Sequence, residues 1–133
     1  MIDIESTLFD RVADAFDSAF PNGSRYGQAV EFPAAFPCLT MVEVDNYTYE
    51  DSLTASMQEN DAWIVYEVDA FSSKPSGAKQ ECKAMIALAD SILFDAGFTR
   101  VFCRPLPNQD DRIYRMKARY RAVVSKDYRV YRR

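Results

Sequence analysis

Residues Arg112 to Val124 read RIYRMKARYRAVV, and basic side chains alternate with apolar ones along this stretch. Because successive side chains of a β-strand point to opposite faces, the alternation predicts a strand with one apolar and one cationic face. The apolar face is expected to pack on helices. The apolar side comprises Tyr114, Met116, Ala118, Tyr120, Ala122 and Val124, and the cationic side Arg115, Lys117, Arg119 and Arg121.

Two earlier segments, 38–47 (CLTMVEVDNY) and 62–71 (AWIVYEVDAF), are rich in β-branched and aromatic residues and also predict strands. Acidic residues alternate with apolar ones in both, and we expect these acids to share the solvent-facing side of one sheet with the cations. The acids are Glu43, Asp45, Glu67 and Asp69. Cross-strand ion pairs within one chain, each worth roughly 0.2–1 kcal/mol, explain the pattern without a ligand. In the alternative interpretation, the cations contact another molecule.

Two helices accompany these strands. Apolar residues recur at helical spacing over residues 4–20, and again between 73 and 97. In the second helix, Ser73 or Ser76 is the candidate N-cap, and Gly97 is placed to end the helix, since glycine adopts the left-handed conformation without a steric penalty.

The remaining segments complete the predicted fold. Residues 98–104 predict a strand and PLPNQDD a turn, whereas the polar segment 48–61 predicts a loop. The final KDYRVYRR is either a short strand or a tail. The order of elements predicts one domain, residues 1–133, of the α+β class: an antiparallel or mixed sheet of four to five strands with two helices packed on one face.

The composition limits the chemistry that we expect. The chain has no histidine, and its three cysteines form no CxxC pair, which argues against ordinary zinc sites and against Ser/His or Cys/His catalytic pairs. We therefore expect no enzyme activity, cofactor or metal; carboxylate sites for Mg²⁺ or Ca²⁺ are not excluded by composition, but no segment resembles a DxDxDG loop. No stretch approaches the ~18 apolar residues that span a membrane, and the N-terminus does not resemble a signal peptide, so synthesis in a reducing cytoplasm is expected.

Charge is divided unevenly along the chain. Residues 1–61 contain 12 acidic and 2 basic residues, a formal charge of −10, whereas residues 62–133 contain 8 acidic and 14 basic residues, a formal charge of +6. This division predicts attraction between the two halves of one chain, or between one copy and the next.

Several aromatic residues are candidate contacts. Trp63 begins a strand and is predicted either to pack on the sheet or to anchor an interface. The FPAAFP segment places Phe32 and Phe36 in an irregular loop, which makes them candidate contacts with a second subunit. Tyr120, together with the tyrosines and arginines of the C-terminal end, also allows an alternative function as a single-stranded nucleic-acid binding module.

The C-terminal half of the chain resembles the tail terminator, or tail-completion, proteins of phages with long non-contractile tails. The resemblance rests on the order of YEVDAFSS, a helix ending in AGFTR, and PLPNQDDRIYRMKARYRAVV with an aromatic-basic end. It implies a structural, non-enzymatic subunit of a ring, expected to be a hexamer, on the head-proximal end of the tail tube in the virion. Such proteins stop polymerisation of the major tail tube protein and contact the head-closure or neck protein.

This resemblance favours the interpretation in which the opposite charges of the two halves attract between neighbouring subunits. In a closed ring each subunit meets its neighbours through two different surfaces, so opposite charges on one chain favour closure. The cationic row is therefore a candidate subunit interface that reaches acids of an adjacent subunit, for example in the 48–61 loop. DNA is expected to pass through the ring without specific binding. A head-closure or connector component is the alternative within virion assembly.

Overall fold

Most of the alternating basic stretch forms β5 (Tyr114–Ser125), an interior strand of the sheet. The computed structural model describes residues 1–30, 33–48, 61–108, 110–128 and 130–131. β3 (Asp61–Ser72) pairs antiparallel with β5 along its whole length, and β4 (Thr99–Leu106) pairs antiparallel with the other side of β5. The basic strand is thus held between two neighbours.

The sheet is completed by three further strands. β2 (Cys38–Thr48) pairs antiparallel with β3, and the short β1 (Ser24–Tyr26) pairs parallel with β2, so the five strands in the order β1-β2-β3-β5-β4 form a mixed sheet. The C-terminal segment is a short strand and not a tail, because β6 (Val130–Tyr131) pairs with the end of β5.

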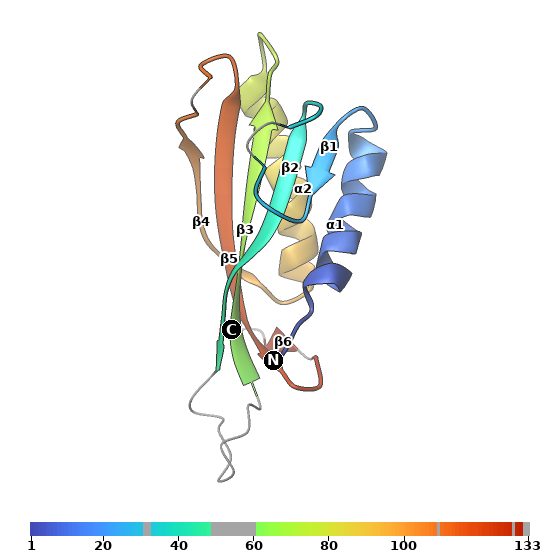
Figure 1. Ribbon diagram of the computed structural model, residues 1–133, viewed down its shortest axis with the longest axis vertical. Coiled ribbons are helices and arrows are strands. Elements are labelled where there is room, and N and C mark those ends of the chain that lie inside the picture. Colours follow the sequence, from blue (N-terminus) through green and yellow to red (C-terminus); the bar gives the residue numbers. More distant parts are fainter. Residues whose placement is uncertain (31–32, 49–60, 109, 129, 132–133) are drawn as a thin grey trace.

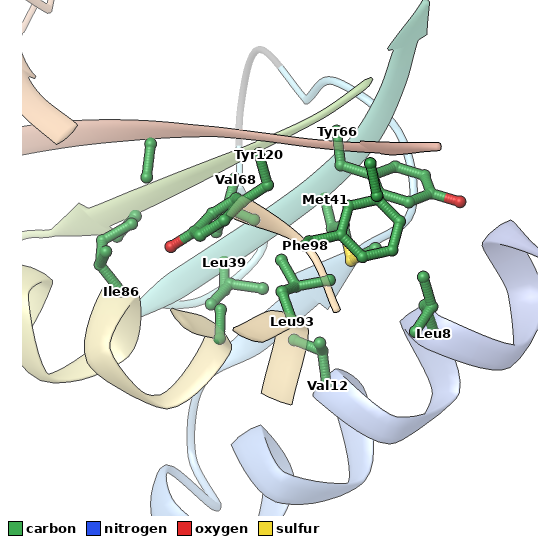
Figure 2. Packing of buried hydrophobic residues seen from close by; sticks show 14 of the residues in the cluster. Leu8, Val12, Leu39, Met41, Tyr66, Val68, Ile86, Leu93, Phe98 and Tyr120 are labelled. Carbon is green, nitrogen blue, oxygen red and sulfur yellow. The ribbon is translucent and has the colours of Figure 1, made fainter. Parts of the chain in front are cut away.

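Helices α1 (Glu5–Ala19) and α2 (Ala78–Asp95) lie on one side of the sheet, with the core between the two layers (Figures 1 and 2). α1 contributes Leu8, Val12 and Phe16 to this core. Tyr66 and Tyr120, from adjacent central strands, are also buried there. The predicted α+β class, with two helices on one face of a four- to five-stranded sheet, is confirmed.

The ends of α2 agree with the sequence prediction at one terminus only. Its N-cap is Gly77, at φ 83°, and no side chain caps the helix, so the prediction of Ser73 or Ser76 as the cap is wrong. At the other end Gly97 has φ 101°, as predicted. The Gly97 N–H donates to the carbonyl of Phe94 and the Phe98 N–H to that of Leu93, both at 2.9 Å, which is a Schellman motif.

Strand β2 contains an irregularity that changes which side chains share a face. Glu43 pairs with Tyr66, and Asp45 pairs with the next residue of β3, so Val44 forms a β-bulge. The bulge places Asp45 on the face opposite the helices, whereas Glu43, ahead of the bulge, lies on the helix side of the sheet and not with the other predicted acids. The phase of β2 is set by Leu39 and Met41, which fill the core ahead of the bulge.

The strand that follows α2 is longer than predicted. β4 continues through Pro105 to Leu106, where the sequence indicated a turn. Proline is tolerated here because β4 is an edge strand, in which an N–H can be absent without breaking a ladder on both sides. The expected 48–61 loop falls mainly on residues 49–60, which lie outside the described residues.

Candidate functional site

The face of the sheet opposite the helices carries the predicted cationic row. Arg119 lies directly across from Glu67 in the β3–β5 register, and Lys117 lies across from Asp69. Arg115 and Arg121 occupy the same face of β5, because they alternate with its buried residues. We call this surface the charged face, and it comprises Arg115, Lys117, Arg119 and Arg121 of β5 with Glu67 and Asp69 of β3.

Three of the four cations of the charged face form ion pairs within the chain. Arg115 Nε lies 3.1 Å from Asp69 Oδ1, and Lys117 Nζ lies 2.9 Å from Glu67 Oε1 and 3.7 Å from Asp69 Oδ2. Arg119 Nε donates to Glu67 Oε2 at 2.8 Å. The two carboxylates thus bridge the cations into one network, which is the arrangement that the within-chain interpretation predicts.

The carboxylates of this network are buried although no helix covers them. Glu67 and Asp69 are each only 8% exposed, because the long side chains of the neighbouring cations lie over them. Burial by itself raises the pKa of the Glu67 carboxyl, but hydrogen bonds from Lys117 and Arg119 outweigh it and hold the pKa below its usual value. Glu67 is therefore kept ionised by its neighbours.

Aromatic rings extend the charged face on both sides of the ion pairs. The guanidinium of Arg121 lies 5.0 Å from the ring centre of Trp63, and that of Arg119 lies 5.3 Å from the ring centre of Phe102. These distances are within the range of cation–π contacts. Trp63 thus packs on the sheet, as one of the two predictions for it stated, and its ring is half-buried.

The other predicted interface residues are not gathered at the ion-pair network. Asp45 lies on the same face as Arg121, but its carboxylate accepts a hydrogen bond from the N–H of Asn46. Glu43 lies on the helix side of the sheet. Its pKa is raised there, mainly by burial and in addition by the nearby charge of Glu5. The prediction that Glu43 belongs to the exposed charged row is wrong, because the core residues of β2 fix its phase.

A cleft of about 850 Å³ opens at one end of the charged face. Phe36 lines it together with Phe71 and Ile113, and the Arg115–Asp69 ion pair also lies along its wall. Phe36 is therefore half-buried at a hollow surface, and its contact with a second subunit stays a prediction. Phe32 lies outside the described residues.

Two charged surfaces were not singled out by the sequence patterns. One is a groove of about 440 Å³ between α2 and β4, the basic groove, whose cations are Lys79, Lys83, Arg100 and Arg104. The other is a row of aspartates on α1, the acidic stripe, formed by Asp10, Asp14 and Asp17. Spacing of like charges by three or four residues in the two helices is the signal that could have revealed them.

The arrangement of tyrosines bears on the nucleic-acid alternative. Tyr120 is 1% exposed, and its hydroxyl donates to Asp90 Oδ1 at 3.0 Å, so its ring cannot stack on a base. Tyr128 is 62% exposed. Arg129, Arg132 and Arg133 lie outside the described residues. Tyr120, one of the residues on which the nucleic-acid alternative rests, is thus part of the core.

Among the described residues, no group of three or more cysteine, aspartate or glutamate side chains is arranged to hold a metal ion. All three cysteines are free thiols; Cys38 and Cys82 are buried and Cys103 is exposed. Within the same described part of the chain, neither helix combines the length and apolar character needed to cross a membrane.

Comparison with known proteins gave no relative: no protein-family model and no curated protein matches the chain.

Proposed function

We propose that this chain is a structural subunit of a phage tail that caps the head-proximal end of the tail tube. One observation carries the proposal: the motifs that resemble tail terminators form a contiguous part of the fold. All but the last residue of YEVDAFSS lies on β3, and AGFTR joins α2 to β4. All but the first residue of IYRMKARYRAVV lies on β5, which is next to both strands. A ring of such subunits stops polymerisation of the major tail tube protein and offers its other side to the neck.

The surfaces of the described residues suit a role in assembly. The fully exposed part of the charged face is small, because three of its cations are already paired with carboxylates. Arg121 and the cleft beside Phe36 remain accessible to a tube or neck protein. Contacts of this kind act through shape and charge complementarity and need no catalytic group.

The proposal is tested by deleting the gene from the phage that carries it and examining the particles by electron microscopy. Tails of abnormal length without heads are expected, and a plasmid copy of the gene should restore normal particles. Tails of normal length beside heads that have lost their DNA would instead identify a head-closure component.

The nucleic-acid alternative is tested with the purified protein in a gel-shift assay at moderate salt. With a net charge of −4 for each chain, we expect weak retention of single-stranded DNA. Strong, salt-sensitive binding would contradict both a structural role and free passage of DNA through a ring.

A further inference from the structure

The basic groove carries cations that have no carboxylate partner in the described part of the chain. Its one acidic residue, Asp90, is already engaged, because Asp90 Oδ1 lies 3.0 Å from Arg100 Nη1 and accepts a hydrogen bond from the hydroxyl of Tyr120. No ion pair among the described residues involves Lys79 or Lys83, and both side chains are exposed. The groove therefore has a surplus of positive charge.

The groove also borders an unprotected edge of the sheet. β4 pairs with β5 on one side only, so the backbone groups along its other side have no strand partner in the described chain. Proteins commonly cover such an edge with a helix, since an open edge promotes unwanted strand pairing. A helix that carries acidic residues would cover the edge and balance the charge of the cations.

Helix α1 carries acidic side chains that complement the cations of the basic groove. Asp10, Asp14 and Asp17 lie at helical spacing on the side opposite the buried residues Leu8 and Val12, and all three are exposed. Asp17 is paired with Arg25 at 3.1 Å, whereas Asp10 and Asp14 form no ion pair with another described residue. Arg25 also interacts electrostatically with Asp14 and Asp10, but one cation does not balance three carboxylates, so the acidic stripe keeps a surplus of negative charge.

The two surfaces lie on opposite sides of the molecule. Figure 1 shows α1 beside β1 at one side and β4 at the other. The acidic stripe of one copy therefore cannot reach its own basic groove. It can reach the groove of a second copy, and this contact would join different surfaces of the two molecules, as in a head-to-tail assembly.

We propose that α1 of one subunit lies along the basic groove of the next, with Asp10 and Asp14 facing Lys79 and Lys83. Both pairs are spaced by four residues on a helix, about 6 Å along the axis, so two contacts form in register. A second copy is the favoured occupant because the chain itself supplies the complementary charge. The inference rests on the proposed ring, and names the surfaces that close it.

Charge reversal tests the contact. Two double variants are compared in sedimentation velocity, and each is expected to weaken self-association at least tenfold. One combines Lys79→Glu with Lys83→Glu, and the other combines Asp10→Lys with Asp14→Lys. An equimolar mixture of the two double variants should associate again, as should the chain that combines all four changes. Reversal of Arg112 and Lys126, which are exposed elsewhere, is the control and should leave association unchanged.

A cross-linking experiment gives an independent measurement. Cys103 lines the basic groove, and it is the exposed one of the three cysteines. Ser18 continues the acidic stripe by one turn from Asp14, so a short bis-maleimide should link Ser18→Cys of one copy to Cys103 of the next and give a ladder of oligomers. The Asp111→Cys variant, with its cysteine in the β4–β5 turn, should give no such ladder.

Three results would overturn the proposal. The first is that the wild-type chain stays monomeric at millimolar concentration. The second is that the charge-reversed variants associate as strongly as the wild type. The third is that an oligonucleotide binds in the basic groove and self-association continues unchanged. The proposed function can fail separately. If the swapped charges restore assembly but phages that lack the gene have normal tails, the contact stands and the tail role does not.

Discussion

At the scale of single residues, Glu43 and Glu67 show how position decides the effect of one side-chain type. Both lie in strands and both are shielded from water, yet their carboxyl pKa values move in opposite directions. Glu67 meets two cations, whereas Glu43 meets the negative charge of Glu5. The two residues should therefore make opposite contributions to stability.

The substitution Glu67→Gln is expected to lower the free energy of unfolding by about 1–3 kcal/mol at neutral pH, because Lys117 and Arg119 lose their charged acceptor. Since the pKa of Glu67 is lowered by folding, its contribution is present above the unfolded pKa and is lost as the pH falls through the folded pKa. Urea denaturation from pH 7 to pH 3 measures this, and a constant difference between the variants would contradict it.

The substitution Glu43→Gln is expected to raise the free energy of unfolding by about 0.5–1 kcal/mol at neutral pH, because it removes a shielded charge near Glu5. Folding raises the pKa of Glu43, so the protonated chain is the more stable one, and the penalty appears as the pH rises through the unfolded pKa. The gain should vanish at pH 3 in the same denaturation series. A loss of stability at pH 7 would show that Asn46 needs the charged acceptor.

Glycine at position 97 is required by both its backbone and its surroundings. Its φ of 101° strains any other residue, and a Cβ there would lie 2.7 Å from Cγ1 of Val130 in β6. We expect Gly97→Ala to lower the free energy of unfolding by about 1–3 kcal/mol. Gly77→Ala, at φ 83° but with no atom within 4 Å of the added Cβ, is the matched control and should cost less. Equal losses would mean that contact with Val130 is unimportant.

At the scale of secondary-structure elements, most of the fold follows from periodicity in the sequence. Alternation in β3 and β5 placed Glu67, Asp69 and the cations on one face, because a paired, regular strand keeps its period of two. Glu43 was predictable, because it continues the period of two set by the buried residues Leu39 and Met41. The switch of Asp45 to the opposite face was not, since no local residue pattern signals the bulge at Val44. β1 was also missed, because three residues held by pairing with β2 are too short for a period.

Helix α2 allows the contribution of packing to be separated from that of helix propensity. Leu93 is fully buried against the sheet, whereas the adjacent Phe94 is 61% exposed. We expect Leu93→Ala to lower the free energy of unfolding by about 2–5 kcal/mol through the cavity that it leaves. Phe94→Ala is the control and should change it by less than about 1 kcal/mol. Similar losses in thermal denaturation would show that Phe94 is covered in solution.

At the scale of the whole molecule, the charged face holds a network of linked ion pairs. The described residues Lys79, Lys83, Asp10 and Asp14, which form no ion pair with another described residue, lie on two other surfaces. The charged face was predictable because its partners alternate in sequence. The basic groove was not, because Lys79 and Arg104 come together only when α2 packs beside β4. An ion-pair network that is already satisfied stabilises the subunit, while unpaired charge on opposite sides favours contact between subunits.

This division of charge predicts different responses to salt. Raising the ionic strength from about 0.1 M to about 1 M shortens the Debye length from about 10 Å to about 3 Å, which screens exposed charges more than shielded ones. We therefore expect association through the acidic stripe and the basic groove to weaken at high salt, with little change in the melting temperature of the subunit. Sedimentation velocity and circular dichroism on the same samples measure both. Association that persists at high salt would indicate an apolar contact instead, and the cleft beside Phe36 would then be the surface to mutate.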